Sequence, residues 1–227
     1  MPRKYSIKIY VQNGCYHVYN RGVDKRIIFQ DEQDYRVFLH LLKYYLSPSN
    51  QGLLHPSTDL PQYSIVRPRP LINLAEKVDL LAFCLMPNHF HLLVKQSTRD
   101  GMQKLMLKIC TTYSMYFNKR NDRVGHLFQG TYKAVLVQDD TYLLHLSRYI
   151  HLNPSELTGV TPVSYPYSSY GYYLGRKKAD WLNTKEILKY FNKDNLLPFL
   201  HKYPSYQRFV EDGNLNSEDK IGTLSLD

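Results

Sequence analysis

Cysteine is scarce in this chain of 227 residues, and Cys15, Cys84 and Cys110 lie far apart. An odd number of cysteines at such spacing predicts neither a disulfide framework nor a paired-cysteine metal site. No run approaches the 18 apolar residues of a membrane span, and the first residues lack the apolar stretch of a signal peptide. We therefore expect a cytoplasmic protein with no membrane partner.

Acidic residues are also few, with 20 against 29 basic ones, which gives a net charge of +9. Residues 1–27 hold six basic residues and one acidic residue, and residues 98–137 hold seven and two, so each segment carries +5. The rest of the chain carries −1. Charge confined in this way predicts a face that binds a polyanion such as nucleic acid, although a basic protein without such a partner is the alternative.

Hydrophobic periodicity predicts strands interleaved with helices. Strands are expected at 16–20, 78–85, 89–95 and 132–137, with a tight turn between the second and third. Helices are expected from the cap Asp31 to about Leu46, from a cap at Thr98 or Asp100 along an amphipathic stripe, and from Asp139 to about Asn153. A short helix is expected near 71–77. This order predicts an α+β fold with a mixed or antiparallel sheet.

The pattern also predicts a division of the chain. Residues 1–170 are expected to form one domain, with a proline-rich insertion at about 47–70. Residues 171–227 are expected to form a partly helical extension that ends in a mobile tail.

The first candidate site is the sequence His89-Phe90-His91. On a strand, alternate residues share a face, so the two imidazoles can converge on one cation while Phe90 points into the core. Two partly exposed histidines without a function are the alternative. No cysteine ligands and no HExxH pattern accompany the pair, which disfavours a structural zinc site.

The second candidate site joins Tyr149 and Asn153, which are four residues apart and thus neighbours on one helix face. A tyrosine hydroxyl and an amide oxygen could approach the same ion, but Tyr149 also has the spacing of a packed core residue. Tyr113 and Tyr116 are rival tyrosines, and their helical spacing favours a core position. His151 is expected at the surface or near the negative helix end.

Three segments in this order resemble a known family: YHVYNRGVDKRIIF, LMPNHFHLLV and YFNKRNDRVGHLFQGTYKAVLVQDDTYLLHLSRYIHLNP. Together they resemble the REP-associated tyrosine transposases and related single-tyrosine HUH transposases, over about residues 10–171. The resemblance implies a ferredoxin-like HUH endonuclease fold with a mainly antiparallel sheet packed with helices. Relatives outside the REP-associated branch often have glutamine where this chain has Asn153.

The resemblance also implies a reaction. Tyr149 would attack a phosphodiester of single-stranded, hairpin-forming DNA and leave a 5′-phosphotyrosine and a free 3′-OH. His89, His91 and Asn153 would bind Mg²⁺ or Mn²⁺, and the protein would be a monomer or homodimer. If DNA is the partner, charge counting predicts seven residues that hold its backbone: Arg21, Lys104, Lys108, Lys119, Arg120, Arg123 and Lys133.

Two other function classes fit parts of the same pattern. A nucleic-acid-binding regulator could keep the scaffold and not cut, although the joint presence of both histidines, the tyrosine and the asparagine argues against it. A metal-dependent phosphodiesterase that uses water would form no tyrosine adduct.

Overall fold

The structure is a computed structural model that describes residues 9–48, 73–192 and 197–212. The strands are β1 (Cys15–Arg21), β2 (Val78–Met86), β3 (His89–Gln96) and β4 (Lys133–Leu136). The longer helices are α1 (Glu32–Leu46), α3 (Gly101–Arg120) and α4 (Asp140–Leu152). Short helical segments are η1 (Val23–Lys25), η3 (Asn153–Glu156), α5 (Tyr170–Tyr173), α6 (Lys185–Leu188), η4 (Lys189–Phe191), η6 (Pro198–Leu200) and α7 (Tyr206–Glu211).

The four strands form one sheet in the order β2-β3-β1-β4, and every neighbouring pair is antiparallel. The tight turn at Pro87-Asn88 joins β2 to β3, as the sequence predicts. The central strands β3 and β1 place His91 opposite Tyr19, and β2 places Cys84 opposite His91 on the other side. The predicted α+β class with an antiparallel sheet is therefore correct.

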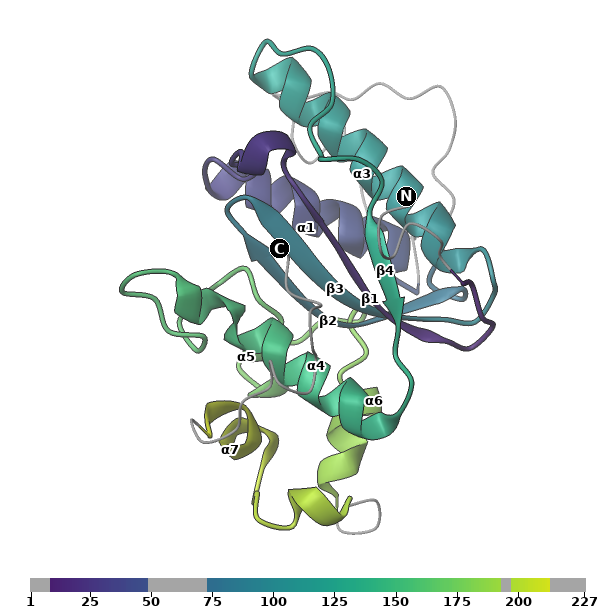
Figure 1. The fold of residues 1–227 in the computed structure, drawn as a ribbon, viewed down its shortest axis with the longest axis vertical. Helices are drawn as coiled ribbons and strands as arrows, with labels where there is room; N and C mark the ends of the chain where they lie inside the picture. The colour runs from purple at the N-terminus through teal and green to yellow at the C-terminus, as the bar shows by residue number, and fades with distance from the viewer. Residues whose placement is uncertain (1–8, 49–72, 193–196, 213–227) are drawn as a thin grey trace, which may run out of the picture.

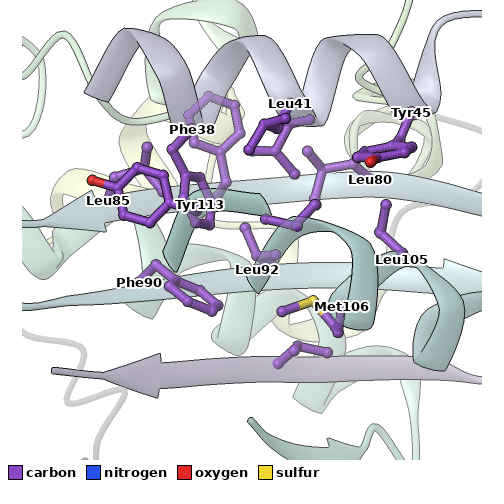
Figure 2. Packing of buried hydrophobic residues seen from close by; sticks show 14 of the residues in the cluster. Phe38, Leu41, Tyr45, Leu80, Leu85, Phe90, Leu92, Leu105, Met106 and Tyr113 are labelled. Atoms are coloured by element: carbon purple, nitrogen blue, oxygen red, sulfur yellow. The ribbon is translucent and has the colours of Figure 1, made fainter. Parts of the chain in front are cut away.

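Helices cover both faces of the sheet. Figure 1 shows α1 and α3 on one side, and α4 with the C-terminal helices on the other. The first side is the larger core, in which side chains of α1 and α3 meet those of the strands (Figure 2). Phe38, Leu92 and Met106, from three different elements, are all fully buried there.

The opposite face of the sheet carries the second core. Ala82, Cys84 and Leu93 project from the strands and pack with Leu144 and Ile150 of α4. The C-terminal helices close this layer, and their buried residues include Ile187, Tyr206 and Phe209. The Cys84 thiol is buried in this layer, where it packs as a small apolar side chain.

Two predicted caps fix the starts of the helices that bracket the sheet. The Asp31 carboxylate accepts hydrogen bonds from the backbone N–H groups of Gln33 and Asp34 at the start of α1. The Asp139 carboxylate accepts from Tyr142 N at the start of α4. Such caps satisfy N–H groups that the first helical turn leaves unpaired. Asp100 precedes α3, but its side chain makes no capping hydrogen bond.

Some predictions from the sequence differ from the structure or lie outside it. Residues 75–77 form a turn that leads into β2, so no helix exists over the described part, 73–77, of the short helix expected there. Most of the proline-rich insertion and residues 213–227 lie outside the described residues. Within the described ranges, no helix is long and apolar enough to cross a membrane. The domain boundary near residue 170 stays a prediction.

Candidate active site

The register of the sheet brings the two histidines of the His-Phe-His sequence to one face. His89 and His91 lie on the side of β3 that α4 covers, with their ring centroids 5.0 Å apart. Phe90 points to the other side and packs on Phe38 at 5.2 Å between ring centroids. The alternation predicted from the sequence is therefore confirmed, and the imidazoles lie between the sheet and α4.

Helix α4 brings Tyr149 to the same place. The Tyr149 ring is half-buried and stands edge-on to two imidazoles, at 5.5 Å from His91 and 6.1 Å from His17 between ring centroids. The rival tyrosines of α3, Tyr113 and Tyr116, are buried in the core on the opposite face of the sheet. Among these three tyrosines, Tyr149 is therefore the one that contacts the paired histidines.

Asn153 follows the last residue of α4 and opens the 3₁₀ turn η3. Its amide nitrogen donates to the backbone oxygen of Tyr149 at 2.9 Å, which fixes the side chain one turn after the tyrosine. Its Oδ1 atom is buried and finds no hydrogen-bond partner in the described part of the chain. A buried amide oxygen without a donor is rare in proteins, and such an atom commonly meets a bound ion or water.

The donor atoms fit a divalent cation. His91 Nε2 is a second buried atom with no partner among the described residues. His89 Nδ1 lies 2.6 Å from Asn88 Oδ1, which can only accept, so His89 carries its proton on Nδ1 and leaves Nε2 for a ligand. No three His, Cys, Asp or Glu side chains gather as a metal cluster in the described ranges. Asn153 would thus supply the third ligand, and mixed nitrogen and oxygen ligation suits Mn²⁺ better than Mg²⁺.

Burial keeps these imidazoles neutral. Desolvation lowers the pKa of His89 to about 4, against a smaller opposite effect of the Asn153 side chain. Desolvation also lowers the pKa of His17 to about 3 and brings that of His91 well below its usual value. Neutral imidazoles keep a lone pair for a cation at physiological pH.

Two of the predicted DNA-binding residues lie beside this site. Arg21 pairs with His89 across β1 and β3, and its charge contributes to the low pKa of His89. The Arg21 guanidinium also donates to Gln129 at 2.9 Å. Lys133 of β4 places its ammonium 5.5 Å from the centre of the Tyr19 ring. The strand register puts both cations on the face of the sheet that carries His89 and His91.

The other predicted DNA-binding residues belong to α3 or follow it, on the opposite side of the sheet (Figure 1). Lys104 forms an ion pair with Asp100 one turn earlier in the chain. Arg123 donates to Asn118 at 2.8 Å. Lys108 and Lys119 complete this group, which the fold does not bring to the histidine pair. Their contact with DNA stays a prediction.

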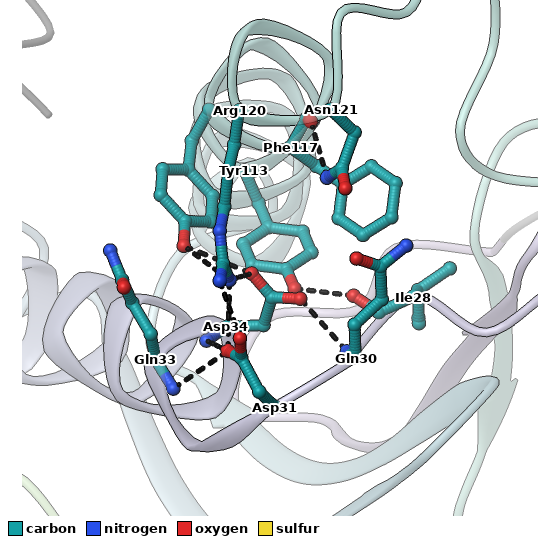
Figure 3. Close-up of polar contacts among 10 residues, drawn as sticks. Ile28, Gln30, Asp31, Gln33, Asp34, Tyr113, Phe117, Arg120 and Asn121 are labelled. Atoms are coloured by element: carbon teal, nitrogen blue, oxygen red, sulfur yellow. Dashed lines mark hydrogen bonds and ion pairs between the residues drawn. The ribbon is translucent and has the colours of Figure 1, made fainter.

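Arg120 joins two helices. Its guanidinium pairs with the fully buried carboxylate of Asp34 at 2.6 Å and with Asp31, both of which belong to the start of α1. Figure 3 shows Arg120 facing Asp31 and Asp34. Tyr116 donates to the same Asp34 carboxylate at 2.9 Å. The guanidinium is therefore already engaged in holding α3 to α1, and its predicted contact with DNA stays a prediction.

Two histidines of this region have positions that the sequence did not predict. His151 was expected at the surface or near the negative helix end; it lies in the last turn of α4 but is fully buried, 2.7 Å from both Tyr206 Oη and Ser169 Oγ. Its buried partners are Tyr206 of α7 and Ser169, which precedes α5. His17 lies under Tyr149, and its alternation with Tyr19 on β1 was the one signal that could have placed it on the site face.

Residues 71–153 match the family model described as "Transposase IS200 like". The chain resembles the IS200-like transposases. This transposase-like stretch holds His89, His91, Tyr149 and Asn153. The fold is similar to a solved structure described as "Structure of the REP associates tyrosine transposase bound to a REP hairpin". That similarity has a TM-score of 0.51 at 14% identity and covers 79% of this chain and 92% of that one.

No curated protein matches the sequence. The structural likeness shows the fold, and the family model shows a resemblance in sequence over the segment that carries the site. The predicted family resemblance and fold class are thus confirmed, whereas the role of each transposase-site residue stays a proposal.

Proposed function

We propose that this protein is a transposase that cleaves and rejoins single-stranded DNA through a covalent bond to Tyr149. The observation that carries the proposal is the contact between the half-buried Tyr149 ring and the buried imidazole of His91, at 5.5 Å between centroids. Asn153, held to the backbone of Tyr149, adds an unpaired amide oxygen from the same helix end. A tyrosine that serves only to pack an apolar core is not expected to lie beside such a set of metal-ligating atoms.

The proposed reaction needs a nucleophile placed at the phosphate and a covalent intermediate that keeps the energy of the cleaved bond. Tyr149 Oη would bond to phosphorus while the bond from phosphorus to the 3′ oxygen breaks, which leaves a 5′-phosphotyrosine and a 3′-OH. The phenol proton leaves Tyr149, and the departing 3′ oxygen gains a proton. Attack by a 3′-OH on the phosphotyrosine reverses the step, so strands are rejoined without an external energy source.

The buried donors would hold a divalent cation. His89, His91 and Asn153 are the residues that fit it, and bound Mg²⁺ or Mn²⁺ supplies positive charge that stabilises the phosphate as negative charge develops. The chain's own part is to keep both imidazoles neutral and in fixed positions, and to place the Tyr149 side chain beside them.

The substrate class follows from charge and from the solved relative. That relative is described bound to a REP hairpin, and we propose a hairpin-forming single strand for this chain as well. Arg21 and Lys133 lie on the site face and would contact phosphates next to the cleaved bond. Such contacts release counterions and make binding dependent on salt.

A labelled hairpin tests the proposal directly. The protein is incubated with single-stranded hairpin DNA and Mn²⁺, and the products are separated under denaturing conditions. A 3′-label should move with the protein as a covalent adduct, whereas a 5′-label should appear in a shortened free strand that ends in 3′-OH. Cleavage of DNA without any adduct would indicate attack by water and contradict the proposal.

Tyrosine variants identify the nucleophile. Tyr149→Phe should bind the hairpin as the wild type does and form no adduct. Tyr142→Phe removes a hydroxyl from the same helix, two turns before Tyr149, and is the matched control that should keep the adduct. An adduct in Tyr149→Phe that disappears in Tyr113→Phe would assign the nucleophile to α3 instead.

A further inference from the structure

A third buried histidine adjoins the pair on β3. His17 is a residue of β1 that is fully buried on the face covered by α4. Its Nε2 atom lies 2.8 Å from Nδ1 of His91. The two rings are inclined by 18° with their centroids 5.0 Å apart, so they are nearly parallel and joined edge to edge by this contact.

A nitrogen–nitrogen contact of this length contains one proton. A neutral imidazole has one N–H donor and one acceptor nitrogen, so one ring donates to the other. If His17 donates, His91 must carry its own proton on Nε2, where it can ligate nothing. If His91 donates from Nδ1, its Nε2 keeps a lone pair. This Nε2 atom is buried and lacks a partner within the described residues.

The neighbouring histidine shows the same arrangement with a different acceptor. The Asn88 amide oxygen accepts from Nδ1 of His89 at 2.6 Å, which leaves Nε2 of His89 as the ligand atom. Residues that hold the second nitrogen of a metal-binding imidazole commonly fix its tautomer and orientation, and their removal weakens metal binding about 10- to 100-fold.

We propose that His17 is a positioning residue that accepts the Nδ1 proton of His91 and thereby presents Nε2 of His91 to the divalent cation. The proposal rests on the proposed function, in that it needs a cation at His91. His17 itself is not a ligand, because its Nε2 atom is engaged by His91. The remaining nitrogen of His17, Nδ1, carries its own proton.

Binding of Mn²⁺ to the full chain without DNA, followed by electron paramagnetic resonance, tests this role. His17→Phe keeps an aromatic ring and removes the acceptor, and should weaken Mn²⁺ binding about 10- to 100-fold. His17→Gln restores an acceptor oxygen and should recover most of the affinity. His145→Phe changes another buried histidine, on α4 and outside the site, and should bind Mn²⁺ as the wild type does.

A measurement on the wild type covers the case in which His17→Phe does not fold. Nitrogen-15 resonances of His91 in the metal-free protein should show Nδ1 protonated and Nε2 unprotonated. A proton on Nε2, or unchanged Mn²⁺ affinity in folded His17→Phe, would overturn the proposal. So would a wild type that binds no Mn²⁺. A wild type that binds Mn²⁺ but forms no DNA adduct refutes the proposed reaction and leaves the role of His17 intact.

Discussion

At the scale of single residues, the site depends on which polar atoms are buried without a partner. Most buried polar groups in proteins are hydrogen-bonded, so Nε2 of His91 and Oδ1 of Asn153 need an explanation. Under the proposed function, a cation held by these two atoms and by His89 would account for both.

Removal of the imidazoles or of the metal should stop cleavage, because the phosphate then lacks the positive charge of the cation. His89→Ala and His91→Ala should each abolish metal-dependent adduct formation, and a chelator should have this effect on the wild type. Direct titration with Mn²⁺ should show that neither variant binds the ion. Adduct formation that persists in excess chelator would contradict the metal site.

The sequence predicted the positions of these four residues better than the residues that surround them. The alternation of a strand and the four-residue spacing of a helix placed His89, His91, Tyr149 and Asn153 on the correct faces. Contacts between strands distant in sequence, such as His17 with His91, depend on a register that no local pattern reveals. The burial of His151 depends on Tyr206 and Ser169, which join it only in the folded chain.

At the scale of elements, one ion-pair cluster fastens α3 to α1. Asp34 is fully buried and faces Arg120, whose side chain is 19% exposed. Arg120→Ala leaves a buried carboxylate without its cation and should lower the free energy of unfolding by about 3 kcal/mol. Urea denaturation measures this decrease.

A matched control tests whether burial is the cause. Arg36 pairs with Glu32 on the exposed side of α1, where their side chains are 68% and 64% exposed. Exposed pairs of this kind contribute little, so Arg36→Ala should cost less than about 0.5 kcal/mol. Equal decreases in unfolding free energy in the two variants would show that the buried ion pairs stabilise the protein no more than the exposed one.

The helix that carries Tyr149 is held from its far side by the C-terminal segment. Tyr206 of α7 donates to Ser147 at 3.0 Å and contacts Nδ1 of His151 at 2.7 Å. Arg148 donates to the backbone oxygens of Phe209 and Val210 at the end of α7. These contacts position α4 against the sheet and hence Tyr149 against the imidazoles.

Removal of one hydroxyl should therefore weaken both stability and catalysis. Tyr206→Phe removes the partner of Nδ1 of His151 and the donor to Ser147 Oγ, and should cost about 1–3 kcal/mol of unfolding free energy. The rate of adduct formation should fall as well, because α4 is then held less firmly against the sheet. Tyr203→Phe removes a less buried hydroxyl, bonded to Asp212, and should affect neither the rate nor the stability as strongly.

At the scale of the whole molecule, the predicted DNA-binding cations are divided between the two faces of the sheet. Arg21 and Lys133 lie on the site face, whereas the cations of α3 lie on the other. Charge counting along the sequence cannot separate these groups, because the order of the residues does not reveal which face of the sheet each segment covers. The α+β class, in contrast, follows from the order of strand and helix patterns, and it was predicted correctly.

Salt dependence of hairpin binding distinguishes the two groups. Replacement of Arg21 or Lys133 by alanine should reduce the slope of log affinity against log salt by about one for each phosphate that the variant no longer neutralises. Lys104→Ala with Lys108→Ala tests the prediction that α3 also binds DNA. An unchanged slope in that double variant would exclude Lys104 and Lys108 from the interface.

The central claim is that the oxygen of Tyr149 becomes covalently joined to DNA. Trypsin cleaves after Arg148 and Arg176, so Tyr149 begins the peptide 149–176 in the digest of a trapped adduct. Mass spectrometry with fragmentation should find the nucleotide phosphate on the first residue of this peptide. A phosphate on any other tyrosine, or on none, would contradict the account.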